Sequence, residues 1–311
     1  NTTDGSPSDA DTTTAPRCAF CRGGDLREVI DFGDMALAGA FLKKENFSRE
    51  KKYPLRICFC TECYAVQVEK PVDAELLFGD YFYFSSAIRT LREHFTEYAA
   101  EVTKRFLPDT ASSSVLEIGC NDGVLLSPFA NEGVGTVIGI DPAQKVTSTI
   151  ADSRVHIVND YFGIPAARSI KERFGPVDLV VANNAYAHIT DINGVTAGIT
   201  EVLNDDGVFV FEVHYMGKIL TEFQYDMMYH EHLFYYSLLA LENHLARHGM
   251  VVFDLKPITI HGGSIRFYAC KKGSAHAASI SDAVTALRKD EHDRGYDKAA
   301  TYEQFARDCK E

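Results

Sequence analysis

Four cysteines near the N-terminus form two Cys-x-x-Cys pairs, Cys18 and Cys21 in RCAFC and Cys60 and Cys63 in CTEC. Each tight turn can present two thiolates to one ion, and a tetrahedral zinc ion takes four such ligands. Two unrelated thiol pairs are the alternative, but neither pair lies in the thioredoxin-like unit that a redox Cys-x-x-Cys normally has. We therefore predict one zinc ion with a closed four-thiolate shell. Such a shell has no open position for catalysis, so the zinc is expected to be structural.

A second set of reactive side chains is the run Tyr229-His230-Glu231-His232. Imidazole has an unperturbed pKa of about 6.5 and suits proton transfer near neutral pH. A carboxylate such as that of Glu231 can orient a catalytic imidazole. The residues could instead decorate an exposed turn, and a metal site made by the two histidines alone would have an incomplete shell. We interpret the run as a candidate acid–base cluster.

A glycine-containing loop follows the apolar stretch VLEIG and holds the cofactor-binding candidates Glu117, Gly119, Asn121 and Gly123. The two glycines allow the backbone to turn sharply and a ligand to approach it closely. The spacing is not that of the six-residue dinucleotide fingerprint, whose third glycine serves close helix–strand packing. The loop predicts a cofactor site and leaves open both a methyltransferase and a dehydrogenase.

Three more polar residues follow apolar stretches in the same half of the chain. Asp141 ends TVIGID, where a carboxylate can accept hydrogen bonds from both ribose hydroxyls of a cofactor; a helix N-cap is the alternative. Asp160 follows VHIV, where contacts to an adenine usually fall, although it could be only a turn residue. Asn183 follows VDLVVA, beneath the expected methyl-donor end, with ordinary turn chemistry as the alternative.

The elements that would position these residues alternate in type from Ser114 onward. Short apolar strands (VLEIG, TVIGID, VHIV, VDLVVANN, GVFVFEV) are separated by segments of helical period. This alternation predicts a parallel doubly wound sheet with ligands at the carboxyl ends of its strands. Two later strands, VVFDLKP and SIRFYACK, fit the sixth and the antiparallel seventh strand of a methyltransferase sheet. We predict an α/β class I (Rossmann-like) methyltransferase core with a small N-terminal zinc-binding lobe.

The charge and composition of the chain limit the classes of molecule that it is expected to bind. The 311 residues carry a formal net charge of −13, which disfavours nucleic acid as a partner because phosphate binding normally needs a basic face. The sequence contains no run of about 18 apolar residues, so it does not predict a membrane-spanning helix. Eight cysteines without a recognisable secretion signal favour metal thiolates and free thiols. We expect a cytoplasmic protein that acts on a small molecule, without a membrane or nucleic-acid partner.

The ordered set of zinc knuckles, YFYFSS, LEIGCNDG, VVANN, YHEH and HGGSIRFYAC resembles the zinc-containing C-methyltransferases of antibiotic sugar biosynthesis. Members of that family act on nucleotide-linked 4-keto deoxysugars, and the similarity runs from about Cys18 to about Lys310. The resemblance implies S-adenosylmethionine as the cofactor and carbon methylation beside a ketone through an enolate. Methylation of a carrier-bound or other small ketone, O- or N-methylation, and a non-catalytic domain of a biosynthetic assembly are the alternatives.

The resemblance also implies roles for individual residues. It makes His232 the general base, with Tyr229 beside the substrate oxygen, and implies that Glu117 fixes the amino end of the cofactor through the loop. It implies substrate contacts by Tyr83 and His261, with a hairpin turn that carries an incidental histidine as the alternative for His261. It also places Ser86 in the wall of the cofactor and substrate pocket, although a helix cap is the alternative for this residue.

Four regions are expected along the chain. Residues 1–16, rich in Thr, Ser and Asp, predict a disordered tail. A zinc-binding lobe is expected over 17–72 and the methyltransferase core over 73–272. Because the family normally continues with a further domain, we expect 273–311 to be the start of a truncated C-terminal region.

Overall fold

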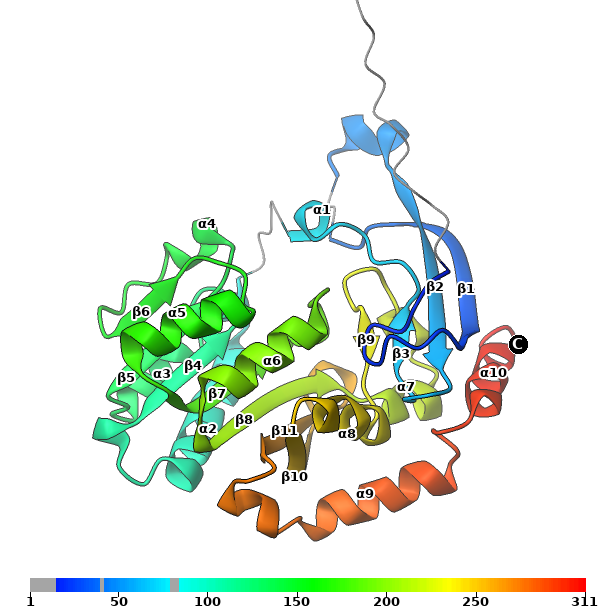
Figure 1. The fold of residues 1–311 in the computed structure, drawn as a ribbon. Coiled ribbons are helices and arrows are strands. Elements are labelled where there is room, and N and C mark those ends of the chain that lie inside the picture. Colours follow the sequence, from blue (N-terminus) through cyan, green and yellow to red (C-terminus); the bar gives the residue numbers. More distant parts are fainter. Residues whose placement is uncertain (1–14, 40–41, 79–83) are drawn as a thin grey trace, which may run out of the picture.

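The central element is a seven-stranded sheet in a computed structural model that describes residues 15–39, 42–78 and 84–311 (Figure 1). Its strands lie in the order β10-β11-β8-β7-β4-β5-β6. The strand β11 runs antiparallel to both neighbours, whereas β4 to β8 are parallel. This order is the class I methyltransferase topology that the sequence predicts. The strands are β4 (Ser114–Ile118), β5 (Thr136–Ile140), β6 (Val155–Val158), β7 (Val177–Asn183), β8 (Leu203–His214), β10 (Met250–Ile258) and β11 (Ser264–Lys271).

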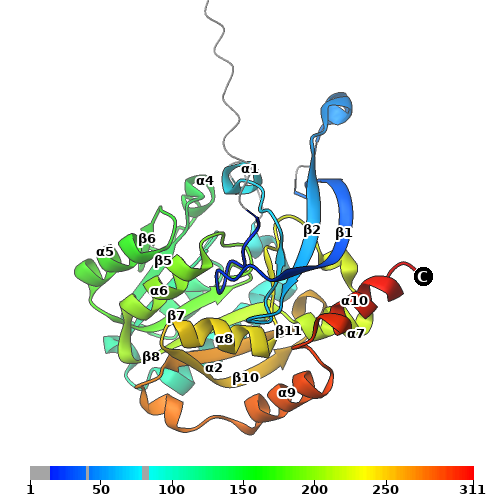
Figure 2. The ribbon, with the colours of Figure 1, turned by 45° about the vertical axis from the view of Figure 1, so that its right-hand side comes forward.

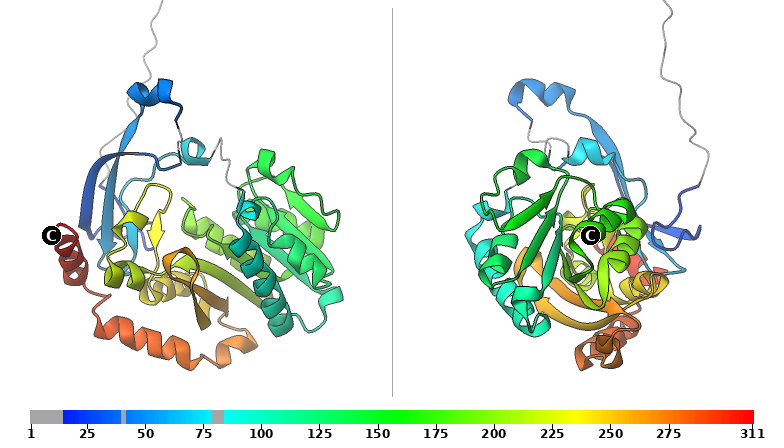
Figure 3. Two further views of the ribbon diagram at one scale, coloured as in Figure 1. Left: turned by 180° about the vertical axis from the view of Figure 1, so that it is seen from behind. Right: turned by 60° about the vertical axis from the view of Figure 1, so that its left-hand side comes forward.

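Helices cover both faces of this sheet, which is why its strands are almost continuously apolar. On β8, Val208 and Val210 join the core formed with α2 and α3, whereas Phe209 and Phe211 join the core on the other face. Figures 1 and 2 show α5, α6 and α8 on that second face, and α2 lies in front when the molecule is seen from behind in Figure 3. The helices are α2 (Arg89–Phe106), α3 (Leu126–Asn131), α4 (Gln144–Thr147), α5 (Ile164–Phe174), α6 (Ile192–Val202) and α8 (Leu238–Arg247).

A smaller antiparallel sheet forms the zinc-binding lobe, with the strand order β1-β2-β3-β9. The segments LREVIDF and YPLRICF belong to its first two strands, and β1 pairs with β2 over most of their length. The fourth strand comes from the other half of the chain, directly after the acid–base run. The strands are β1 (Leu26–Ala36), β2 (Lys52–Cys60), β3 (Val66–Val68) and β9 (Phe234–Tyr235). The short 3₁₀ helix η1 (Lys44–Arg49) lies between β1 and β2, and α1 (Ala74–Phe78) and the 3₁₀ helix η2 (Ser85–Ala87) come after β3.

The C-terminal helices α9 (Asp282–Asp293) and α10 (Ala299–Asp308) run from the large sheet to the lobe, as Figure 1 shows in orange and red. The ring of Tyr302 in α10 stacks on Phe59 of β2 with their centroids 4.4 Å apart. Helix α7 (Met216–Glu222) contributes Met216 and Ile219 to the same lobe core. The predicted lobe, residues 17–72, therefore shares its core with segments that lie far along the chain.

Some expectations fall outside the described residues or need adjustment. Most of the predicted disordered tail, residues 1–14, lies outside them. AQKVTSTIA, one of the segments of helical period between the predicted strands, contains only the four-residue helix α4. Among the helices of the described residues, none combines the length and the apolar character that crossing a lipid bilayer requires.

Candidate active site and metal centre

The four predicted zinc ligands meet at one point of the lobe. Their sulfur atoms all lie within 4.8 Å of one another, with Cys18 Sγ 3.5 Å from Cys63 Sγ and Cys21 Sγ 3.6 Å from Cys60 Sγ. A tetrahedral zinc ion with Zn–S bonds of about 2.3 Å separates its sulfur atoms by about 3.8 Å. The spacing therefore fits zinc, and three of the four thiols are buried.

Both knuckles have the same local geometry. In each, the residue after the second cysteine is in the left-handed region, Arg22 with φ of 64° and Tyr64 with φ of 68°. The backbone amides of these residues donate to the carbonyls of Cys18 and Cys60 at 2.9 and 2.8 Å. These turns aim both thiolates of a pair to the same side, so each half of the site is built by local backbone geometry.

The glycine loop after β4 has the backbone that its sequence predicts. Gly119 and Gly123 have φ of 72° and 75°, and Asn121 between them has φ of 49°. A Cβ on Gly119 would lie 2.7 Å from the Cβ of Ala185, and a Cβ on Gly123 would press on Ile150. Both positions therefore require glycine for conformation and for space.

Three carboxylates surround this loop. Glu117 is buried, and burial, followed by the nearby charges of Asp141 and Asp122, raises its pKa well above the usual value. Within the described part of the chain, Glu117 Oε2 and Asp122 Oδ1 have no hydrogen-bond partner. Buried acceptors of this kind are rare unless a donor occupies the site. A ligand that carries hydroxyl and ammonium donors, as S-adenosylmethionine does, fits this set.

Asp141 already has two local partners. Its Oδ2 accepts from the amide of Asn121 at 3.0 Å, and its Oδ1 accepts from the amide of Ala143 at 2.8 Å. It therefore links the glycine loop to the start of α4, and its bond to the Ala143 amide is similar to the helix cap that the sequence left as the alternative. A carboxylate oxygen has a second lone pair, so the side chain retains acceptor capacity for ribose hydroxyls.

The remaining predicted cofactor residues lie at different depths. Ser86 is exposed in η2, and its amide donates to Asp122 Oδ2 at 3.0 Å, so this segment lies against the glycine loop. Asp160 is exposed after β6. Asn183 ends β7 and is paired in register with Glu212 of β8. The two expected substrate contacts, Tyr83 and the side chain of His261, lie outside the described residues.

Tyr229 and His232 form a hydrogen-bonded pair. Tyr229 Oη lies 2.8 Å from His232 Nε2, and His232 Nδ1 lies 3.0 Å from the carbonyl oxygen of Met227. Because a carbonyl only accepts, Nδ1 carries the hydrogen and Nε2 accepts from the tyrosine hydroxyl. Nε2 is thus the basic atom of the imidazole, as a general base at His232 requires.

His188 is a neighbouring histidine that the sequence interpretation did not single out. Its ring centroid lies 5.0 Å from that of His232, and its Nδ1 donates to the carbonyl of Glu231 at 2.7 Å. Burial lowers its pKa below the usual value. Its position just after β7, in the segment NNAYAH, is the signal that could have identified it, because ligands lie at the carboxyl ends of such strands.

The other two residues of the run point toward the lobe. His230 is 1% exposed, and its Nε2 donates to the carbonyl of Tyr53 in β2 at 3.1 Å. The Glu231 carboxylate interacts with the backbone of Gly39, and burial raises its pKa. The expectation that this carboxylate orients an imidazole is therefore not the observed arrangement. The orienting group is the backbone carbonyl of Glu231, which binds His188.

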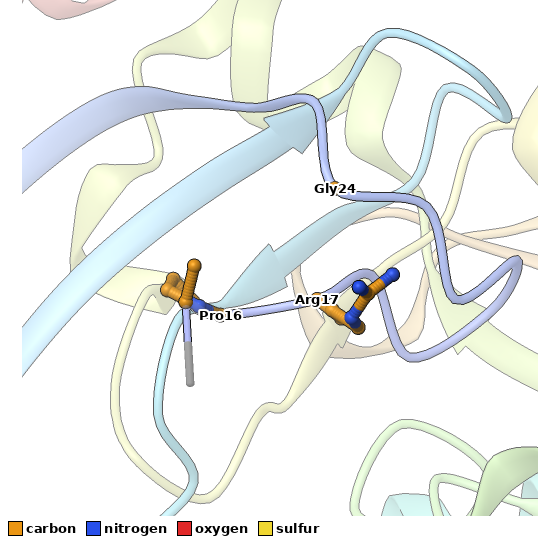
Figure 4. A pocket seen from close by; sticks show the side chains of 4 residues that line it. Pro16, Arg17 and Gly24 are labelled. Carbon is orange, nitrogen blue, oxygen red and sulfur yellow. The ribbon is translucent and has the colours of Figure 1, made fainter. Parts of the chain in front are cut away.

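A shallow hollow near residue 15 lies beside the first zinc knuckle. Ala15, Pro16, Arg17 and Gly24 line it, as Figure 4 shows for the three labelled residues. None of these lining residues belongs to the metal, cofactor or acid–base sets. The hollow therefore has no part in the candidate site.

Comparison with known proteins assigns the chain to a family. A methyltransferase domain model matches residues 91–255, a zinc binding domain model matches 18–78, and a C-methyltransferase C-terminal domain model matches 259–311. The C-methyltransferase NovU of Streptomyces niveus is 31% identical over 290 residues, which are 93% of this chain and 68% of NovU. The chain belongs to the zinc-binding C-methyltransferase family.

Two further relatives are similar to a smaller part of the chain. A ubiquinone biosynthesis O-methyltransferase of Bradyrhizobium sp. (strain ORS 278) is 30% identical over 99 residues, 31% of this chain and 38% of that protein. The crystal structure of magnesium protoporphyrin IX methyltransferase from Synechocystis PCC 6803 with bound SAH has a TM-score of 0.45 and 11% identity, covering 58% of this chain and 83% of that one. This C-methyltransferase is thus an enzyme with S-adenosylmethionine and zinc as its cofactors.

Proposed function

We propose that the enzyme methylates a carbon next to a ketone through an enolate, on a nucleotide-linked keto-deoxysugar. The observation that carries the proposal is the contact of His232 Nδ1 with the Met227 carbonyl, because it requires the hydrogen on Nδ1 and leaves Nε2 as the basic atom. A C–H bond beside a carbonyl is acidic enough for an imidazole base to break it. The C-methyltransferase NovU, similar over nearly the whole chain, supports transfer to carbon.

The cofactor would lie over the glycine loop. Glu117 would hold its amino end through the loop, and Asp141 would accept from the ribose hydroxyls. The buried acceptor atom Oε2 of Glu117 supports this assignment, because a donor there would satisfy it. S-adenosylmethionine supplies a methyl group on a positive sulfur, which takes the electron pair of the breaking carbon–sulfur bond.

The chain's own residues would manage the proton and the enolate. His232 Nε2 removes the proton from carbon, and the electron pair of that C–H bond moves onto the carbonyl oxygen. The Tyr229 hydroxyl, released from Nε2, donates to this oxygen. His188, held by the Glu231 carbonyl, lies beside the imidazole and contributes to the wall of the site. When the electron pair returns, the carbon forms its bond to the methyl group.

Isotope exchange tests the proposal without requiring turnover. The enzyme, a nucleotide-linked 4-keto deoxysugar and S-adenosylhomocysteine are incubated in deuterium oxide, and exchange at the carbon is followed by NMR. His232→Asn should lower both exchange and turnover by about a hundredfold to ten-thousandfold, the usual contribution of a positioned base. Its affinity for S-adenosylhomocysteine should remain that of the wild type, and His230→Ala should lose less activity.

Two outcomes would redirect the assignment. Exchange by His232→Asn at the wild-type rate would mean that another group is the base, with Tyr229 and His230 the next to test. If no keto-deoxysugar or other small ketone exchanges a proton, carbon methylation through an enolate is untenable. O-methylation of a small molecule would then be the better assignment.

A further inference from the structure

The segment that follows His232 is bonded to the zinc lobe on one side and to the core on the other. Strand β9 pairs with β3, with Gln67 opposite Phe234, and the amide of Val68 donates to the carbonyl of Leu233 at 2.9 Å. The amide of Leu233 in turn donates to the carbonyl of Ala187 at 2.9 Å. Leu233, one residue after the base, is therefore held by both halves of the molecule.

The connection from this strand to the zinc knuckle is short. The buried side chain of Gln67 accepts at Oε1 from the amide of Ala19, at 2.8 Å, and Ala19 lies inside the first knuckle. The ring of Phe20, in the same knuckle, packs on Phe234 with the centroids 5.0 Å apart. The turn of the second knuckle is joined to the start of β3 by the bond from the Cys60 amide to the Ala65 carbonyl, at 2.8 Å. Both knuckles thus contact the strand that pairs with β9.

The side chains of the acid–base run, residues 229–232, point in two directions. Tyr229 and His232 bond to each other, and His232 faces His188. His230 instead donates to the Tyr53 carbonyl of the lobe, and the Glu231 carboxylate reaches the lobe loop at Gly39. The Gly39 position is matched to this contact, since a Cβ there would lie 2.7 Å from Glu231 Oε1.

We propose that His230 and Gln67 are positioning residues through which the zinc lobe sets the place of the Tyr229–His232 pair. Nε2 of His230 contacts the Tyr53 carbonyl and the side chain is 1% exposed, so this histidine is placed to hold the backbone of the motif against the lobe. Gln67 passes the geometry of the first knuckle to β9 through its bond to Ala19. The inference rests on the proposed function, because it takes His232 as the base.

The main test compares two substitutions of His230. In His230→Phe an aromatic ring of somewhat larger volume remains and the Nε2 donor is lost, whereas in His230→Gln an amide donor stands at the same distance along the side chain. We expect His230→Phe to bind zinc and S-adenosylhomocysteine as the wild type does, and to lower kcat and substrate deuterium exchange about tenfold or more with an unchanged KM for S-adenosylmethionine. His230→Gln should recover most of this loss.

Two results would overturn the positioning role of His230. One is a His230→Phe enzyme with wild-type kcat and exchange. The other is a pair of variants that are both as inactive as His232→Asn, which would place His230 at the substrate itself.

A second measurement needs neither substrate nor the folding of the His230 variants. Hydrogen–deuterium exchange of backbone amides is compared in the zinc-loaded enzyme, in the enzyme treated with a chelator, and in zinc-loaded Gln67→Met. We expect exchange over residues 228–236 to rise severalfold in the second and third samples, while helix α2, residues 89–106, keeps its protection. Unchanged protection over 228–236 in both samples would overturn the inference.

The experiments can refute the proposed function and the positioning role independently of each other. If no ketone is methylated but residues 228–236 lose protection with the zinc, the lobe still positions the segment and the chemistry must be reassigned. If His232→Asn abolishes exchange while the His230 and Gln67 variants behave as the wild type, the proposed function stands and the positioning role falls.

Discussion

The four-cysteine cluster and the Tyr229–His232 pair both adjoin strands of the small sheet but are held by contacts between residues at different separations along the chain. Each cysteine pair is presented by a turn of a few residues, closed by bonds such as Arg22 N to Cys18 O. The acid–base run depends on partners far along the chain, since His230 binds the carbonyl of Tyr53, 177 residues away. A metal site can therefore be built from local turns, whereas the catalytic pair depends on the packing of the lobe on the core.

The largest expected effect is loss of the metal. Cys60→Ala leaves three thiolates, and because zinc binding is coupled to folding of such lobes, the variant should lose most of its zinc and several kcal/mol of lobe stability. The matched control is Cys58→Ala, which removes a buried thiol from the same strand outside the cluster. Metal analysis and thermal unfolding distinguish the two. Equal zinc content in both variants would mean that Cys60 is not a ligand.

A smaller effect is expected at the cofactor site. Asp141→Ala removes a charged acceptor of ribose hydroxyls, at a cost of about 1.5–3 kcal/mol, or roughly tenfold to a hundredfold in affinity for S-adenosylmethionine. Calorimetry measures the affinity and circular dichroism checks the fold. Asp160→Ala, in an exposed turn, is the control with a weaker effect. Wild-type affinity in Asp141→Ala would reduce this residue to the link between Asn121 and α4.

The difference between local contacts and contacts far along the chain also explains what could be predicted from the sequence. The strands of the large sheet are apolar runs buried on both faces, and the knuckles and glycine loop depend on residues within one turn. The pairing of β9 with β3 could not be predicted, because two residues, Phe234 and Tyr235, carry no periodic signal. The direction of the Glu231 side chain was also inaccessible, since it depends on how the lobe packs against the core, whereas the place of His188 just after β7 was a usable signal.

A further buried acid connects the C-terminal helices to the core. Glu291 of α9 is fully buried, and its carboxylate accepts from the amides of Leu238 and Leu239 at 2.8 and 2.9 Å and from the hydroxyl of Tyr215 at 3.0 Å. Burial is the main cause that raises its pKa, against the effect of these donors, from 4.5 to about 7. Helix α10, which packs on the lobe, follows this anchor. The lobe is thus connected to the core by a titratable contact as well as by the pairing of β3 with β9.

The smallest predicted effect is a pH dependence from this anchor. Between pH 4.5 and about 7 the folded state keeps a proton on Glu291 that the unfolded chain releases, so the free energy of unfolding falls as the pH rises through this window and levels off above it. From pH 6 to pH 8 the fall is about 1 kcal/mol. Glu291→Gln cannot titrate and should lose this part of the slope in denaturant unfolding. Glu242→Gln, which breaks the ion pair with Arg288 on the same α8–α9 contact, retains Glu291 and should keep most of this slope, because the charge of Glu242 is the smallest of the effects on the pKa of Glu291. An unchanged slope in Glu291→Gln would show that the proton is not held there, and the connection of the C-terminal helices to the core would then be insensitive to pH.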